Sequence, residues 1–129
     1  MRSSKRVAVV AALGLSCLLA LGAVCSTAGA LTAKQKAIRV RVGIRDLQVT
    51  LQSYSIDNGD LYPRFTSNPQ FRALLTPWVY RHWPINPYSG RSMRNKRSAG
   101  NFTYATYANL SKFRLIGWGP HGRRILVAP

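Results

Sequence analysis

Acidic residues are almost absent from this sequence. It has no glutamate and three aspartates, against 19 Lys and Arg side chains, which gives a formal net charge of +16. Setting Arg2, Lys5 and Arg6 aside still leaves +13 on the rest of the chain. This imbalance predicts attraction to anionic partners such as DNA, acidic envelope polymers or acidic lipid. It is also compatible with a charged surface that keeps the protein soluble and has no specific ligand.

Residues suited to catalysis or metal binding are equally scarce. The cysteines, Cys17 and Cys25, lie near the N-terminus, so residues 31–129 have no thiol for a disulfide, a metal or nucleophilic attack. The histidines, His82 and His121, are far apart in the sequence, and no serine has a nucleophile motif around it. No acidic cluster offers the oxygen ligands that calcium needs. We therefore expect no catalytic residues, no metal site, no cofactor and no enzymatic activity.

Charge is missing altogether from residues 7–33. As a helix, these 27 residues would extend roughly 40 Å, enough to cross a hydrocarbon core of about 30 Å. Basic residues precede the stretch, and Ala28, Gly29 and Ala30 fit a small-residue cleavage site. We expect residues 1–30 to be a signal peptide or a membrane anchor. The protein is then a single-pass membrane protein with an extracytoplasmic C-terminal domain, or is secreted if cleaved after Ala30.

An amphipathic helix is predicted directly after this stretch, over residues 33–57. Its apolar residues recur in steps of three and four, which places them on one helix face. A turn signal follows at Asp57, Asn58, Gly59 and Asp60, which is typical of a helix terminus. The predicted stem-packing residues are Ala37, Val40, Ile44, Leu47, Leu51 and Tyr54.

The rest of the chain reads as a small α+β head. Ser67, Asn68 and Pro69 precede a short helix predicted over residues 70–75, and residues 78–100 form a long irregular segment rich in proline and turn signals. Alternating apolar and polar residues predict strands over 101–107, 113–118 and 124–127. We expect about three antiparallel strands, with one face on the long helix, in a single domain over residues 31–129.

One basic segment is a candidate binding site. Arg91, Arg94, Lys96 and Arg97 lie in the irregular segment near Tyr88. Basic side chains interleaved with aromatic ones hold phosphates and stack bases in single-strand binders. The alternative is a solvated loop whose aromatic residues anchor it to the sheet. These four residues are the possible anion-binding site.

Four segments, in the same order along the chain, carry a resemblance to a known family. They are residues 44–63 (ending Asp57-Asn58-Gly59-Asp60-Leu61-Tyr62-Pro63), residues 83–90 (Trp83-Pro84-Ile85-Asn86-Pro87-Tyr88-Ser89-Gly90), residues 100–104 (Gly100-Asn101-Phe102-Thr103-Tyr104) and residues 117–122 (Gly117-Trp118-Gly119-Pro120-His121-Gly122). Together they resemble the major pseudopilins of type II secretion and their type IV pilin-like relatives. The N-terminus departs from that pattern. Lys5 stands where the family has the leader glycine, and Val10 lies near the position of its early glutamate.

The resemblance implies a non-enzymatic structural subunit that packs its N-terminal helix into a filament core. Its partners would be other pseudopilin-like subunits and an inner-membrane assembly platform, in a type II secretion or type IV pilus-type apparatus. The alternative hypothesis is an exported or membrane-anchored basic module that has kept a pilin-like head and binds DNA or acidic envelope polymers.

Overall fold

The structure, a computed structural model, describes residues 29–129. Residues 1–28 of the predicted signal or anchor segment therefore lie outside the described residues. The first long helix, α1, spans Ala33–Asp57 and begins with a capping box. The Thr32 hydroxyl accepts a hydrogen bond from the Gln35 amide (3.2 Å), and the Gln35 side chain accepts one from the Thr32 amide (2.8 Å). This reciprocal pair satisfies two amides that a helix start leaves open, so α1 begins at Ala33.

The end of α1 lies where the turn signal predicts it. Asn58 caps the helix and donates its side-chain amide to the Tyr54 carbonyl at 2.8 Å. Gly59 and Asp60 then adopt positive φ angles of 67° and 60°, which reverse the chain and end the helical pattern. The amide of Tyr62 donates to the carbonyl of Leu110 at 2.8 Å and joins this exit to the sheet hairpin.

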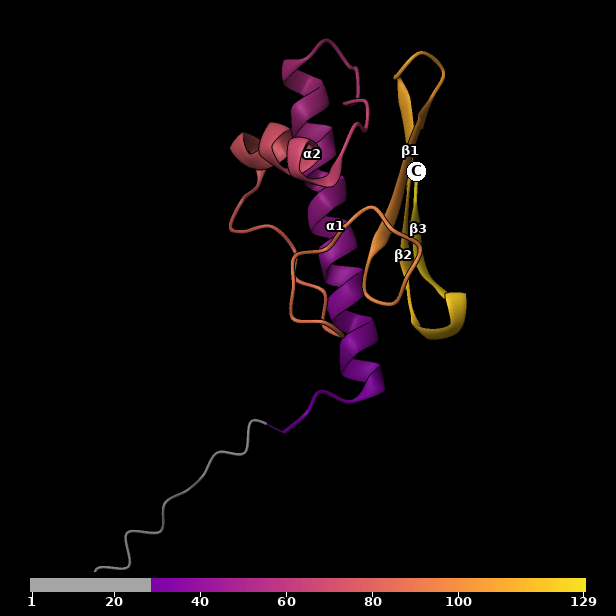
Figure 1. Cartoon of the computed structure of the whole chain (residues 1–129). Coiled ribbons are helices and arrows are strands. Elements are labelled where there is room, and N and C mark those ends of the chain that lie inside the picture. Colours follow the sequence, from indigo (N-terminus) through magenta and orange to yellow (C-terminus); the bar gives the residue numbers. More distant parts are fainter. Residues whose placement is uncertain (1–28) are drawn as a thin grey trace, which may run out of the picture.

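The second helix, α2, spans Asn68–Leu75, and a short 3-10 helix, η1, follows at Thr76–Trp78. α2 starts two residues earlier than predicted because Ser67 is its N-cap, with the Ser67 hydroxyl 3.4 Å from the Gln70 amide. Proline fits the first turn of a helix, whose amides have no helical partner. Figure 1 shows α2 beside the C-terminal half of α1.

Three antiparallel strands form one sheet beside α1 (Figure 1). They are β1 (Phe102–Tyr107), β2 (Lys112–Trp118) and β3 (Arg124–Ala128), in the order β1-β2-β3. A second 3-10 turn, η2 (Pro120–Gly122), connects β2 to β3. The predicted α+β class, with a long helix and three antiparallel strands, is confirmed.

The hydrophobic core lies between α1 and one face of the sheet. Four predicted stem residues, Val40, Ile44, Leu47 and Leu51, are 0–1% exposed. The close approach of α1 depends on Gly117 in β2, because a Cβ there would lie 2.6 Å from the Ile44 Cγ1 atom. The sheet contributes buried residues of all three strands: Phe102, Tyr104, Phe113, Leu115 and Ala128.

The two ends of the predicted stripe differ from its middle. Ala37 and Tyr54 are partly buried rather than buried. The Tyr54 ring packs edge-on against Trp78 of η1, with centroids 4.9 Å apart. Tyr54 therefore uses part of its surface to hold η1 against the helix. The buried face of α1 is also wider than predicted, since it includes Gly43, Thr50 and Ser55.

Aromatic residues complete the core beyond the reach of α1. Phe71 of α2 packs against Tyr104 with centroids 4.8 Å apart, and Tyr62 against Phe113 at 4.5 Å. The Tyr104 hydroxyl donates to the Pro63 carbonyl at 2.7 Å. Burial raises the pKa of this phenol well above its usual range, because the charged form would lose its hydration.

Candidate functional site

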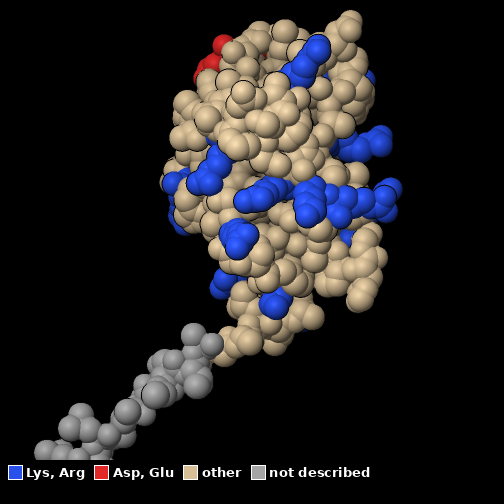
Figure 2. Space-filling view, viewed as in Figure 1, with Lys and Arg blue, Asp and Glu red and all other residues tan. Residues whose placement is uncertain are grey.

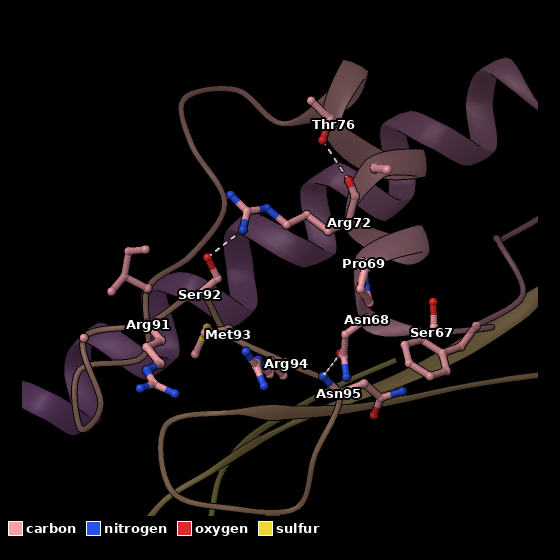
Figure 3. Close-up of a pocket in the computed structure, with 14 residues that line it drawn as sticks. Ser67, Asn68, Pro69, Arg72, Thr76, Arg91, Ser92, Met93, Arg94 and Asn95 are labelled. Atoms are coloured by element: carbon pink, nitrogen blue, oxygen red, sulfur yellow. Dashed lines mark hydrogen bonds between the residues drawn. The ribbon is translucent and has the colours of Figure 1, made fainter.

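An open groove of about 1090 Å³ lies on the described part of the chain. One wall runs along α2 from Ser67 to Thr76, and the facing wall is the segment 90–95 (Figure 3). Its polar and charged lining residues are Ser67, Asn68, Arg72, Thr76, Arg91, Ser92, Arg94 and Asn95.

The backbone of the 90–95 wall is held by the protein at several points. The Arg94 amide donates to the Asn101 side chain at 3.0 Å, and the Asn95 amide donates to the Asn68 side chain at 2.6 Å. Further back, the buried Asn86 side chain donates to the Ala99 carbonyl at 2.9 Å. The groove therefore has a defined shape, while its arginine side chains extend from a fixed backbone.

Three arginines line this groove. Arg72 of α2 donates from Nη1 to the Ser92 hydroxyl at 2.7 Å across the groove. Arg91 and Arg94 lie on the facing segment, and both are exposed (Figure 3). Guanidinium groups present several planar donors, which suits them to phosphate and carboxylate groups. The arrangement can hold an anion between α2 and the 90–95 segment.

The four residues predicted as a possible anion site do not all come together. Arg91 and Arg94 line the groove, but Lys96 and Arg97 do not. The Arg97 guanidinium instead lies 4.7 Å from the ring centroid of Trp118, in a cation–π contact. Arg72 belongs to the groove and was missed, because a residue of α2 reaches this wall only through the tertiary fold.

No acidic side chain opposes the charge of the groove. Residues 61–129 contain eleven Lys and Arg side chains and no Asp or Glu. Figure 2 shows Lys and Arg side chains in a band across one face, with acidic atoms visible only at its upper edge. A one-sign surface of this kind raises the local concentration of anionic partners.

The face of α1 that points away from the core is also apolar. Ile38, Val42, Val49 and Ile56 are 47%, 52%, 58% and 74% exposed. Their spacings of four, seven and seven place them within about 40° of one another on a helix. We call these four residues the outer stripe. The buried residues Val40, Ile44, Leu47 and Leu51 lie on the opposite side, so α1 has two apolar faces.

The described residues contain neither a candidate metal site nor a candidate membrane span. Within residues 29–129, no three His, Cys, Asp or Glu side chains lie close enough together to hold a metal ion. No helix of this part of the chain is long and apolar enough to cross a membrane. The chain matches no family model, no curated protein and no solved structure.

Proposed function

We propose that this protein is a non-enzymatic, pilin-like structural subunit that assembles through its long helix. The outer stripe is the observation that carries the proposal. A helix in a small monomeric domain buries one apolar face and exposes a polar one. Here four large aliphatic side chains lie exposed along the side of α1 that faces away from the core. A second apolar face of this length suits a helix that packs on two sides.

The occupant of the outer stripe is proposed to be α1 of a second copy. The stripe spans 19 positions, from Ile38 to Ile56, so its partner has to be comparably long. Among the described residues, α1 is a helix of that length, with 25 residues, whereas α2 has only eight. Two copies packed stripe against stripe would bury these side chains against one another.

The kind of apparatus is inferred from the family resemblance. Its four segments lie at the end of α1, in the irregular segment, in β1, and at the β2–β3 turn. This arrangement supports a subunit of a type II secretion or type IV pilus-type apparatus. Its partners would be other pseudopilin-like subunits and an inner-membrane assembly platform. Residues 1–30 would hold the protein in the membrane, with the head outside the cytoplasm.

Acidic substitutions on the outer stripe test the proposal. Val42→Asp combined with Val49→Asp should abolish oligomers of the full-length chain in sedimentation velocity in mild detergent, because buried carboxylates would face each other. The thermal melt of the head should change little. Tyr80→Asp with Asn109→Asp adds the same charge at exposed positions off the helix and should leave oligomers intact. Unchanged oligomers in the stripe variant would contradict assembly through α1.

The arginine groove favours a second candidate function, a binding module for DNA or acidic envelope polymers. The three guanidinium groups and the absence of acids would hold phosphates in a salt-dependent way. Arg72→Gln, Arg91→Gln and Arg94→Gln together should then weaken DNA binding far more than Arg64→Gln, Lys112→Gln and Arg114→Gln, which remove the same charge at exposed positions. Equal losses in filter binding at physiological salt would mean diffuse attraction and exclude this function.

A further inference from the structure

A second pocket lies where α1 begins. It has a volume of about 410 Å³ and is formed by residues 33–41 of α1, by Tyr88, and by the turn between β2 and β3 with the start of β3. Figure 1 shows that turn at the same end of the molecule as the start of α1. The pocket therefore joins residues 33–41 to residues 119–125, which are far apart in the sequence.

Cationic side chains from both segments line this pocket. Lys34 and Arg41 come from α1, and Arg123 and Arg124 follow η2. We call these four residues the basal cluster. Lys34 and Arg41 lie seven positions apart on α1, which is about two helical turns and places them on the same side of the helix. The imidazole of His121 adds a fifth nitrogen-bearing side chain to the lining.

The charge of the basal cluster has no acidic counterpart in the pocket. No Asp or Glu lines it, and the first turn of α1 has none. The N-terminal end of a helix carries a partial positive charge, so Lys34 lies near a further positive pole. Like charges held this close repel one another, and an anion placed among them would relieve that repulsion.

The rest of the pocket lining is apolar. Ala33, Ala37, Pro120 and Ile125 surround the cationic side chains, together with the ring of Tyr88. A pocket with an apolar wall and cationic donors suits a ligand that is itself amphiphilic. A phosphate next to a glycerol backbone has this chemistry, whereas a fully solvated polyanion would gain nothing from the apolar wall.

The position of the pocket in the chain identifies the source of such a ligand. Ala33 lines the pocket and is also the last residue of the uncharged stretch 7–33. If that stretch lies in a bilayer, as the proposed function requires, chain connectivity places the pocket at the membrane surface. Basic residues next to a membrane segment attract acidic lipid headgroups.

We propose that the basal cluster binds the phosphate of an acidic phospholipid and holds the base of the head against the membrane surface. This inference rests on the proposed membrane attachment. It adds a site that the packing of α1 does not need, because Lys34, Arg41, Arg123 and Arg124 are all exposed. The lipid would fix the tilt of α1 relative to the bilayer, and so present the outer stripe in one direction.

Full-length protein in lipid nanodiscs tests the proposal. Discs of phosphatidylcholine alone are compared with discs that also contain phosphatidylglycerol, and hydrogen exchange is followed by mass spectrometry. In the acidic discs, exchange of residues 33–41 and 119–125 should slow by about tenfold. Lys34→Gln, Arg41→Gln, Arg123→Gln and Arg124→Gln together should remove this protection.

A matched variant controls for net charge. Arg64→Gln, Arg81→Gln, Lys112→Gln and Arg114→Gln remove the same charge at exposed positions outside both pockets and should retain the protection. Equal protection in both variants, or none in the unaltered protein, would overturn the proposal. Protection in phosphatidylcholine discs by soluble glycerol phosphate alone would assign the pocket to a free phosphate ester and overturn its membrane source.

The experiment also separates this inference from the proposed function. Protein that leaves discs of both compositions on gel filtration would disprove membrane attachment itself. Protein that stays in both kinds of disc, but shows no effect of phosphatidylglycerol, would leave the attachment standing and disprove the lipid site alone.

Discussion

Substitutions at two nearby positions of α1 distinguish the role of its buried face from the role of its outer stripe. Leu47 is 1% exposed and belongs to the core, whereas Val49 is 58% exposed. Leu47→Ala removes buried methyl groups and leaves a cavity, which costs about 2–5 kcal/mol. For a domain of this size each kcal/mol lowers the melting temperature by roughly 4–8 °C, so a loss of about 8–40 °C is expected. Val49→Ala should stay within about 0.5 kcal/mol of the unaltered head.

One substitution should affect the stability of the head, and the other should affect self-association. Circular dichroism melts in mild detergent, at concentrations where the chain is monomeric, measure the stability of the head. Sedimentation velocity at higher concentrations measures self-association. Leu47→Ala should lower the melting temperature while the remaining folded protein still associates, and Val49→Ala should weaken association without changing the melt. Equal melting temperatures for the two variants would refute the assignment of the two faces.

Two further predictions concern the irregular segment and the core. Gly100→Ala should destabilise the head strongly, because a Cβ at φ +78° would overlap the Asn86 side-chain amide; unchanged urea unfolding would contradict this packing. Tyr104 should make the head less stable at alkaline pH, because its pKa is raised in the folded state. The stability that the protonated Tyr104 phenol contributes is complete below the pKa of an unfolded tyrosine, about 10, and is lost as the pH rises above that value. Tyr104→Phe loses the hydrogen bond to Pro63, which costs about 1 kcal/mol near neutral pH, and should show a smaller loss of stability above pH 10; equal losses in both proteins would contradict the role of Tyr104.

Local patterns in the sequence were enough to predict the main elements. The spacing of Val40, Ile44, Leu47 and Leu51 has the period of a helix, and all four are buried as that period predicts. Turn residues, which act within a few positions, similarly located the end of α1, and the Ser67, Asn68 and Pro69 signal placed the start of α2 to within two residues. The strands were predicted from alternating apolar and polar residues, as around Phe102 in β1.

Contacts between distant segments could not be predicted in this way. Arg72 lines the same groove as Arg91 and Arg94 only because α2 packs beside the irregular segment. Arg97 does not line it, because its guanidinium group packs on the Trp118 ring. The outer stripe is a different case. Its spacing of four and seven is present in the sequence. A second set of apolar residues with a helical period is hard to recognise, however, until the structure shows which set is buried in the core.

Site-specific crosslinking in membranes tests the central claim, assembly through α1, most directly. In a chain with Cys17→Ser and Cys25→Ser, a single Val49→Cys substitution places a thiol on the outer stripe. A single Arg114→Cys substitution places one on an exposed position of β2, on the sheet face opposite Phe113 and Leu115. Mild oxidation should produce a disulfide-linked dimer from Val49→Cys and little from Arg114→Cys. No dimer from Val49→Cys, or equal dimer from both, would contradict assembly through the long helix.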